Sequence, residues 1–479
     1  MEHDLATKNT RDEGKPEHAV GSAEYDAATK RAAAVVAAVA SFLTPFMGSS
    51  INVALPLISE EFALGAVLMS WVPVSFILSA TMFLVPCGRL ADIHGRKKIF
   101  FWGTAVYTLF SLLSALASSG VTLIAFRFLQ GIGGAMIFGT GVAILTSVFP
   151  PWERGKALGI NVAAVYTGLS LGPFAGGFLT HLFGWRSIFL ANVPLGLLVL
   201  LLVWLKLKGE WAEAKGEAFD IGGAVIYSLA LVATIYGFSV LPGSTGLLLV
   251  ALGTAGIAAF IAWESRVSNP VLDVSLFRHN RVFAFSSLAA LIHYCATFAV
   301  AFLMSLYLQY IKGLTPEGAG TVLAAQPVVM ALFSPFAGRL SDRIEPRVVA
   351  SLGMSLTVVG LLVLVFLEFE TPFGVIVAGL VLLGIGFALF SSPNTNAIMS
   401  AVQRRFYGVA AGTAGTMRML GQMLSMGIVM MLFALLLGQA RVTPQNYGLF
   451  LTGMKISFAI FAVLCVGGIF ASLARGRLR

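Results

Sequence analysis

The sequence predicts an all-α integral membrane protein with fourteen transmembrane helices, arranged as two six-helix bundles and an extra two-helix hairpin. Three observations predict it: long uncharged apolar runs, basic residues confined to alternate connecting segments, and a motif repeated in the two halves of the chain. The chain has 479 residues, of which 58% are hydrophobic and only 11% charged, and its mean hydropathy is +0.89. Soluble proteins are about 25% charged, so most of this chain is expected to lie in lipid.

Apolar runs of about 18 or more residues are long enough to cross a bilayer as helices. We place them at residues 32–58, 67–87, 99–118, 121–147, 157–182, 187–206, 219–241, 246–263, 282–311, 317–338, 348–367, 373–397, 408–437 and 449–473. The alternative is twelve spans, with 219–263 as an amphipathic linker. The two runs in that stretch contain no internal charge, which favours fourteen.

Lysine and arginine set the expected orientation. The termini and every second connection between the predicted spans, counted with the residues at their borders, hold 25 of these residues. The connections that alternate with them hold 3. Short loops rich in Lys and Arg stay in the cytoplasm, so both termini are expected to be cytoplasmic in the plasma membrane. The polar stretch 1–31 has no apolar core with a cleavage site, and we interpret it as a disordered cytoplasmic tail rather than a signal peptide.

An internal repeat divides the chain. GRLADIHGRK at 88–97 recurs 250 residues later as GRLSDRIEPR at 338–347. This offset predicts an N-terminal six-helix bundle at 32–206 and a C-terminal six-helix bundle at 282–473, with the transmembrane hairpin 219–263 between them.

The first copy of the repeat is a candidate conformational latch. Gly88 and Gly95 permit close approach and tight turning, and Asp92 offers a carboxylate to an arginine or a helix N-terminus of the facing half. The alternative is that the basic residues, Arg89 and Arg96 among them, only set topology. That reading leaves the glycine spacing and the repeated aspartate, Asp92 and Asp342, unexplained.

Several function classes are disfavoured. The sequence contains no G-x-x-x-x-G-K-[ST] phosphate loop and no H-E-x-x-H motif, and its three cysteines lack metal-ligand spacing. We therefore expect no enzyme activity, no cofactor and no metal site. The placement of the basic residues fits topology, so we expect no nucleic-acid partner. Nothing indicates an obligate protein partner, and an ion gradient would have to drive any transport.

Five stretches resemble known transporter motifs. Residues 88–98 resemble the loop signature of the major facilitator superfamily, and 127–135 (RFLQGIGGA) is similar to its fourth-span motif. Residues 168–177 (GLSLGPFAGG) resemble the antiporter motif of span five. NVALP at 52–56 and GWRSIFLANVP at 184–194 extend the resemblance, which points to the fourteen-span drug:proton antiporter family.

The resemblance implies the major facilitator fold and proton-coupled export of small molecules by alternating access, in the manner of a multidrug efflux pump. Two positions depart from the family pattern. Met47 stands where the first span usually carries Asp, and Ile93 replaces a basic residue of the loop signature. The first departure removes a site where a proton or a cation could bind.

Span five carries glycines every fourth residue, a spacing that forms a smooth groove for a neighbouring helix. Pro173 can bend that span because it leaves a backbone carbonyl unpaired. We interpret the segment as a gate that permits close contact between the halves; ordinary helix packing is the alternative. The gating candidates here are Gly168, Gly172, Pro173, Gly176 and Gly177.

Ionisable groups at membrane depth are costly and therefore functional candidates. Arg127 lies about 9 Å into span four beside Gln130, and Arg418 lies about 15 Å into span thirteen. His293, near mid-depth in span nine, has an unperturbed pKa in the physiological range. These four are the candidates for coupling or for the cavity, against the alternative of structural packing.

No Asp or Glu lies in mid-span, so the interior suits neutral, zwitterionic or anionic cargo better than a cation. Buried amides need partners, and some of them could line a cavity. The candidates are Asn52, Gln309, Gln326, Asn394, Asn396 and Gln422.

The sequence favours a secondary transporter for lipophilic or amphipathic small molecules, exchanged for protons. A flippase or facilitator for a neutral or anionic amphipathic metabolite is the alternative that the missing first-span Asp raises. A membrane sensor or scaffold that has kept the fold is a third possibility.

Overall fold

A computed structural model describes residues 26–150, 153–267, 270–272, 274–402 and 407–476. Most of the predicted tail at 1–31 lies outside the described residues. Its last five residues do not match the prediction, because α1 begins at Ala27 with Asp26 as its N-cap.

The first half of the chain forms six long helices, and a hairpin of two more follows it. The helices of the first half are α1 (Ala27–Glu61), α2 (Ala66–His94), α3 (Arg96–Ala115), α4 (Gly120–Val148), α5 (Arg154–Phe183) and α6 (Arg186–Lys206). The hairpin consists of α7 (Ile221–Ser239) and α8 (Ser244–Glu264).

The second half repeats the six-helix plan, but one of its helices ends in a π-helical turn and another is divided into two. A short helix, α9 (Ser275–His279), precedes it. Its helices are α10 (Arg281–Leu306), which continues as a π-helical turn η1 (Tyr307–Ile311), α11 (Pro316–Leu323), α12 (Ala325–Arg343), α13 (Pro346–Val365), α14 (Phe373–Ser400), α15 (Tyr407–Leu436) and, after a 3-10 turn η3 (Pro444–Asn446), α16 (Tyr447–Ala474). Fourteen helical segments of the described chain are long and apolar enough to cross a membrane, as predicted.

Two boundaries differ from the prediction in an informative way. Residues 88–94 are not a loop but the last two turns of α2, and the first six residues of the second copy continue α12 in the same way. In the first copy the break falls at Gly95, whose φ of +116° is strained for any residue with a side chain. Gly95 therefore makes the tight turn that was expected, whereas Gly88 lies within a helix.

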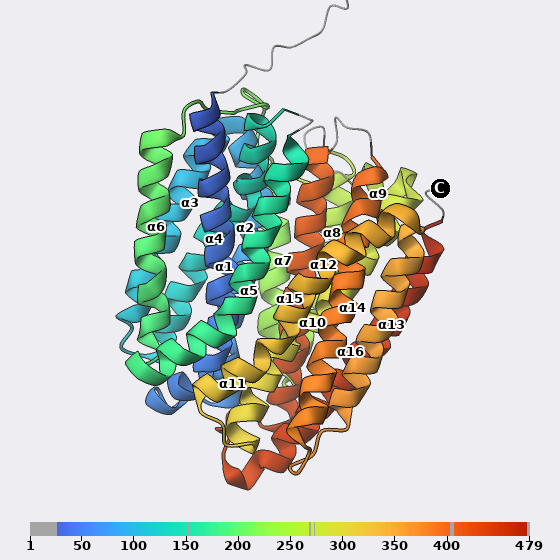
Figure 1. Cartoon of the computed structure of the whole chain (residues 1–479). Coiled ribbons are helices and arrows are strands. Elements are labelled where there is room, and N and C mark those ends of the chain that lie inside the picture. Colours follow the sequence, from blue (N-terminus) through green and yellow to red (C-terminus); the bar gives the residue numbers. More distant parts are fainter. Residues whose placement is uncertain (1–25, 151–152, 268–269, 273, 403–406, 477–479) are drawn as a thin grey trace, which may run out of the picture.

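The two halves stand side by side, each built of helices that run the length of the molecule (Figure 1). In the first half α1 packs against α5, and α4 packs against both α2 and α3. In the second half α13 packs against α14 and α16, and α10 against α15. The hairpin helices pack on each other, and α7 also contacts α2 and α15.

Each half has one helix crossing where two glycines meet, and the two crossings are equivalent. A Cβ at Gly133 would lie 2.7 Å from the Gly103 carbonyl oxygen, where α4 crosses α3. A Cβ at Gly386 would lie 2.8 Å from the Gly353 carbonyl oxygen, where α14 crosses α13. Backbone contact of this kind is typical of packing between membrane helices. The crossings recur at nearly the spacing of the sequence repeat, so the two halves share one internal plan.

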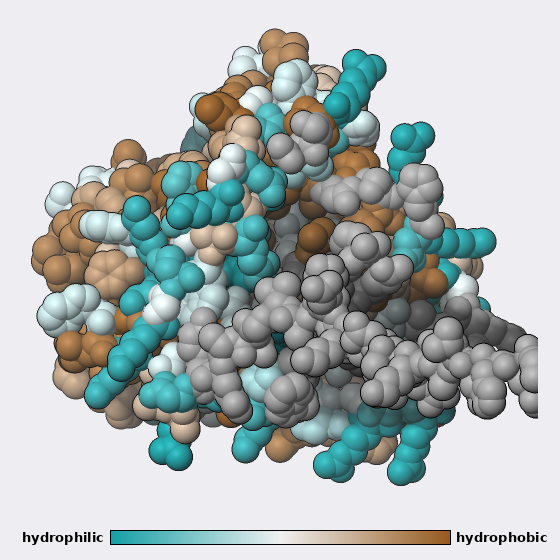
Figure 2. All heavy atoms as spheres, turned by 90° about the horizontal axis from the view of Figure 1, so that it is seen from above, coloured by the Kyte–Doolittle hydropathy of each residue, from teal (hydrophilic) through white to brown (hydrophobic). Residues whose placement is uncertain are grey.

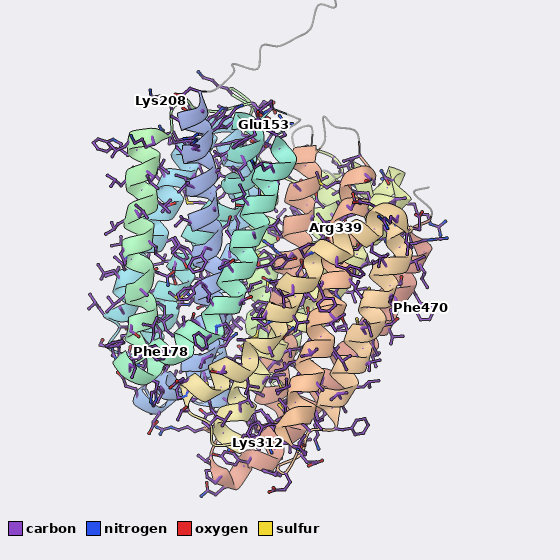
Figure 3. All side chains as sticks on the ribbon, in the orientation of Figure 1. Glu153, Phe178, Lys208, Lys312, Arg339 and Phe470 are labelled. Atoms are coloured by element: carbon purple, nitrogen blue, oxygen red, sulfur yellow. The ribbon has the colours of Figure 1, made fainter. Side chains whose placement is uncertain are left out.

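The lateral surface is apolar. Phe178 and Phe470 project from opposite sides of the molecule (Figure 3) and are 45% and 69% exposed. Many other large apolar side chains along the helices are exposed as well, and an apolar surface of this extent suits lipid rather than water. Hydrophilic side chains gather instead on the end from which α1 starts (Figure 2), and Lys208 and Glu153 lie there (Figure 3). This end is called the termini end below, and the opposite one the remote end.

Gly133→Ala should destabilise the protein. Its new methyl would lie 2.5 Å from the Tyr107 backbone nitrogen, and two backbones cannot yield as a flexible side chain can. Overpacking of this kind costs about 1–3 kcal/mol, which thermal unfolding of the purified protein would show as a lower midpoint. Gly467→Ala on α16 is the control, since a Cβ there meets nothing within 4 Å. Equal midpoints for both variants would refute the packing argument.

Candidate functional site

The halves are joined by hydrogen bonds toward the remote end. Ser305 Oγ of α10 donates to the Asn52 carbonyl oxygen of α1 at 2.7 Å. One turn on, Gln309 Nε2 donates to the Val53 carbonyl oxygen at 3.0 Å. These bonds place Asn52 and Gln309, two of the predicted cavity amides, at the contact between the halves.

The loops at the remote end extend this contact. The Ala66 nitrogen donates to the Ala440 carbonyl oxygen at 3.0 Å, and Arg441 Nε donates to the Ala63 carbonyl oxygen at 3.2 Å. Each bond joins a residue of the first half to one of the second. The remote end is therefore held shut in this conformation.

The glycines of span five divide between two roles. Gly168, Gly172 and Gly176 were expected to contact the other half, but they pack against α1 of their own half: a Cβ at Gly176 would lie 2.8 Å from Ser50 Cα. In this conformation these three glycines pack within their own half, and their gating role stays a prediction. The structure gives the expected contact to Gly177 instead, where a Cβ would lie 2.5 Å from the Pro316 carbonyl oxygen of α11.

Pro173 shares this contact between halves. A Cβ at Gly320 of α11 would lie only 2.1 Å from the Pro173 carbonyl oxygen. Neither Gly177 nor Gly320 can accept a side chain without separating the halves at the remote end.

A polar cluster joins the halves between these ends. The Tyr166 hydroxyl of α5 interacts with the hydroxyls of Ser334 on α12 and Ser391 on α14, and it lies within electrostatic range of Tyr294 and Arg418. We call these five residues the central cluster. Tyr166 comes from the first half and the other four come from the second.

Arg418 is the charged member of the central cluster. Its side chain is half-buried, and its Nε is buried without a hydrogen-bond partner. The guanidinium carbon lies 5.5 Å from the ring centre of Phe138 on α4 of the first half. A guanidinium with an unused donor and an aromatic face beside it is suited to a planar or anionic group.

The sequence singles out Arg418 by its depth in the membrane but gives no sign of the four hydroxyl residues of the central cluster. Serine and tyrosine are common in membrane helices, so nothing in the sequence separates these four from Ser and Tyr residues that bond within a helix. Their significance depends on which helix faces they occupy.

Arg127 lies elsewhere. It is 1% exposed in the first half, where Nη1 donates to Gln130 Oε1 at 2.6 Å and the guanidinium lies 4.5 Å from the Phe76 ring centre. Gln130 Nε2 in turn donates to Ser111 Oγ at 2.6 Å. This network joins α2, α3 and α4 within one half, so it is suited to bonding the bundle together.

His293 is fully buried in the second half. Its ring lies 4.0 Å from that of Phe390 and 5.3 Å from that of Phe387, measured between ring centres. Neither ring nitrogen has a hydrogen-bond partner. A proton carrier needs groups that give and take the proton. The two phenylalanines supply none, and Tyr294, whose ring centre lies 6.3 Å away, makes no hydrogen bond to the His293 ring.

The remaining amides differ in their surroundings. Asn394 is committed to structure: its Nδ2 donates to the Ser286 carbonyl oxygen at 3.0 Å and its Oδ1 accepts from Arg475 at 2.9 Å. Asn396 is half-buried and accepts from Ser400 on its own helix at 3.4 Å. Gln326 and Gln422 are half-buried as well, which leaves them as cavity candidates.

The motif at 88–98 is held by its own half. We call residues 207–217, which follow α6, the strap. Arg96 forms a bidentate pair with Glu213 of the strap, at 2.7 and 2.9 Å, and Arg89 pairs with Glu217 at 2.5 Å. The strap therefore pairs with the two arginines of the motif, Arg89 and Arg96.

Asp92 does not reach the facing half in this conformation. Its carboxylate accepts from Arg96 Nε at 2.9 Å, within the same motif, and its carbonyl oxygen accepts from the Ala214 nitrogen of the strap at 2.9 Å. The expected latch to the other half is thus replaced here by a contact within the first half. The second aspartate, Asp342, lies exposed at the end of α12.

No group of three His, Cys, Asp or Glu residues among those described is placed to hold a metal ion. The inward-facing polar groups of the central cluster are one cation and four hydroxyls. Such a set can bind a small molecule by hydrogen bonds and charge, but it carries no hydrolytic chemistry.

Comparison with known sequences decides the family. The sequence profile of the Major Facilitator Superfamily matches residues 37–426, and a second match covers 286–477. The chain belongs to the Major Facilitator Superfamily. It is an integral membrane transporter of this superfamily, and the superfamily consists of transporters, not enzymes.

Relatives within the superfamily include drug exporters. The chain is 33% identical to the multidrug resistance protein Stp of Mycobacterium tuberculosis, over 79% of this chain and 71% of that protein. It is 30% identical to the cephamycin export protein CmcT of Amycolatopsis lactamdurans, over 91% and 92%. The riboflavin transporter RibZ of Clostridioides difficile is 28% identical, over 91% and 95%.

Solved structures share the fold. A bacterial homologue of the human lysosomal transporter Spinster, in an inward-facing and unoccupied conformation, superposes with a TM-score of 0.68 at 17% identity, over 94% of this chain and 98% of that one. The fold expected from the resemblance is therefore confirmed.

Gly320→Leu should open the remote end. The added side chain cannot fit against the Pro173 carbonyl, so the halves must separate there. Spin labels at Glu60 and Lys312, on the remote ends of the two halves, should move apart in a double electron–electron resonance measurement. Gly374→Leu is the matched control, because a Cβ there meets nothing within 4 Å. Unchanged label distances in the Gly320 variant would show that this contact does not hold the halves together.

Proposed function

We propose that this superfamily member is a secondary active exporter of lipophilic or amphipathic small molecules, driven by proton exchange in the manner of a multidrug efflux pump. The observation that carries the proposal is the central cluster, where Tyr166 of one half lies beside Ser334 and Ser391 of the other and within electrostatic range of Arg418. Cargo bound between the halves would be exposed to either side in turn as they rock.

The conformation and the charge pattern set the proposed direction. The basic connections lie with the termini, so we assign the termini end to the cytoplasm of a plasma membrane. The halves are joined at the remote end, which supports a conformation that takes up cargo from the cytoplasm. Relatives named for drug resistance and antibiotic export support outward transport.

One observation favours a second candidate, a facilitator or flippase for a neutral or anionic metabolite. Met47 is 1% exposed in the apolar core of the first half, at the position where the antiporter pattern has Asp. No Asp or Glu lies in the middle of a membrane helix in the described chain. If transport is nevertheless coupled to protons, the proton must bind to a group other than a carboxylate in the first span.

The coupling is tested in proteoliposomes with an imposed pH gradient. Addition of cargo should start proton movement, reported by a pH-sensitive dye trapped in the vesicles. Riboflavin and a cephamycin are reasonable first cargoes, given the names of the relatives. Cargo flux that is unchanged when all ion gradients are collapsed would instead establish the facilitator. Absence of any flux, for these and a wider compound set, would point to a sensor or scaffold.

Arg418→Ala should weaken transport of anionic cargo, because it removes the charged member of the central cluster. Loss of a charge-assisted hydrogen bond costs about 1.5–3 kcal/mol, which corresponds to roughly a 10- to 150-fold rise in the cargo Kd. Arg418→Lys should restore part of the affinity, since it keeps the charge. Lys156→Ala, at an exposed site on the termini end, is the control. Equal affinity in wild type and Arg418→Ala would remove Arg418 from the site.

A further inference from the structure

Two carboxyl groups meet at the base of the hairpin, outside the central cluster. Asp220 is the N-cap of α7 and Glu264 is the last residue of α8, and the strap leads into α7 here, so both lie at the termini end. A Cβ at Gly223 would lie 2.3 Å from Glu264 Oε1 and 2.5 Å from Asp220 Oδ2, so these two oxygens converge on one small space. We call Asp220 and Glu264 the carboxyl pair.

Glu264 is buried, and one of its carboxyl oxygens receives no hydrogen bond. The residue is 3% exposed, and its Oε2 accepts from the Leu272 backbone nitrogen at 2.9 Å. Oε1 is buried without a hydrogen-bond partner, although the Asp220 carboxyl lies within hydrogen-bonding range of Glu264. An ionised carboxylate accepts hydrogen bonds but cannot donate one. Without a proton, therefore, the two groups could only face each other as like charges.

Asp220 is the member of the pair that is suited to carry a negative charge. Its Oδ1 accepts from the Gly223 backbone nitrogen at 3.0 Å, and its Oδ2 accepts from Trp263 Nε1 at 3.0 Å. Negative charge is favoured at the N-terminus of a helix, where Asp220 caps α7. Asp220 is also half-buried, whereas Glu264 is almost completely buried. A single charge is therefore best placed on Asp220, and a proton on Glu264.

No basic side chain of the described residues forms an ion pair with either carboxyl group. Asp220 is the one charged group among them that acts on Glu264, and α2 and α15, which pack against α7, supply none. Along the chain, the nearest charged residues are Glu217, which pairs with Arg89, and Arg266, which is exposed. Two ionised carboxylates in contact, one of them buried, would repel each other without compensation.

We propose that the carboxyl pair is a proton-binding site, in which a proton on Glu264 Oε1 is donated to Asp220 Oδ2. The proton gives the unpartnered oxygen a hydrogen bond and removes the repulsion between the two groups. Carboxyl groups that lie in contact share one proton for this reason. The proton comes from water at the termini end, where Asp220 is half-buried, and its release returns Glu264 to the carboxylate.

The position of the carboxyl pair lets a proton act on both halves. The hairpin lies beside both of them (Figure 1), since α7 packs against α2 of the first half and α15 of the second. Glu264 also holds Leu272, in the linker that leads to the second half. Loss of the proton would push the pair apart and loosen this base. If protons drive the exporter proposed above, the pair is the carboxyl site that the first span lacks; only this step rests on the proposed function.

Infrared spectroscopy of the intact purified protein, without cargo, tests the site. At neutral pH, where ordinary Asp and Glu are ionised, wild type should show the C=O stretch of a protonated carboxyl group, and Glu264→Gln should lack that band. Asp220→Asn should lose it too, because the new amide keeps the helix cap and donates to an ionised Glu264. Glu370→Gln, exposed between α13 and α14, is the control and should leave the band unchanged. A band that persists in either variant of the pair would overturn the proposal.

Thermal unfolding gives a second measurement. Raising the pH removes the shared proton and leaves two like charges in contact, so the unfolding midpoint of wild type should fall as the band disappears. Glu264→Gln keeps a neutral donor toward Asp220, and its midpoint should fall less over the same pH range. An equal fall in both proteins, or a wild-type midpoint raised by sodium ions at constant ionic strength, would refute a proton site. Neither measurement uses transport, so its outcome is separate from that of the flux assays.

Discussion

The structure depends on one constraint: hydrocarbon offers no partner to a backbone N–H or C=O group. Every segment that crosses the membrane must satisfy its own backbone, and helices do so. Fourteen helical segments of the described chain meet the length and hydropathy that crossing requires. The departures from regular helix, at η1 and between α11 and α12, occur in the second half near its contacts with the first. Irregular backbone is thus placed where protein, rather than lipid, surrounds it.

Once helices are obligatory, lipid cannot drive them together by the hydrophobic effect, and close backbone packing takes its place. The glycine crossings at Gly133 and Gly386 show this within each half, and Gly177 and Gly320 show it between the halves. The same type of contact thus serves two purposes. Within a half it gives rigidity, whereas between halves it gives a contact without side chains to interlock, which can separate and reform.

Buried polar side chains in the membrane need partners too, and the two arginines differ in how they find them. Arg127 is buried with an amide, a backbone carbonyl and an aromatic ring around it, and it joins three helices of one half. Arg418 keeps a buried Nε without a partner and sits where the halves meet. A donor left unpaired at membrane depth is costly, and this one lies at the contact between the halves, which is why the proposed site includes Arg418.

The sequence by itself determined the number of helices, the division into two related halves and the membrane environment, because hydropathy, charge and repeat spacing act locally along the chain. It also identified Arg418 by its depth alone. Only the tertiary structure decided the partners. It turned Gly168, Gly172 and Gly176 toward α1 and paired Asp92 with Arg96. It also placed the strap against the motif and gathered Tyr166 with Ser334 and Ser391. The physical reason is that a helix sequence specifies its own apolar length well, but most of its faces are apolar, so which face meets which neighbour is settled by side-chain packing across the whole bundle.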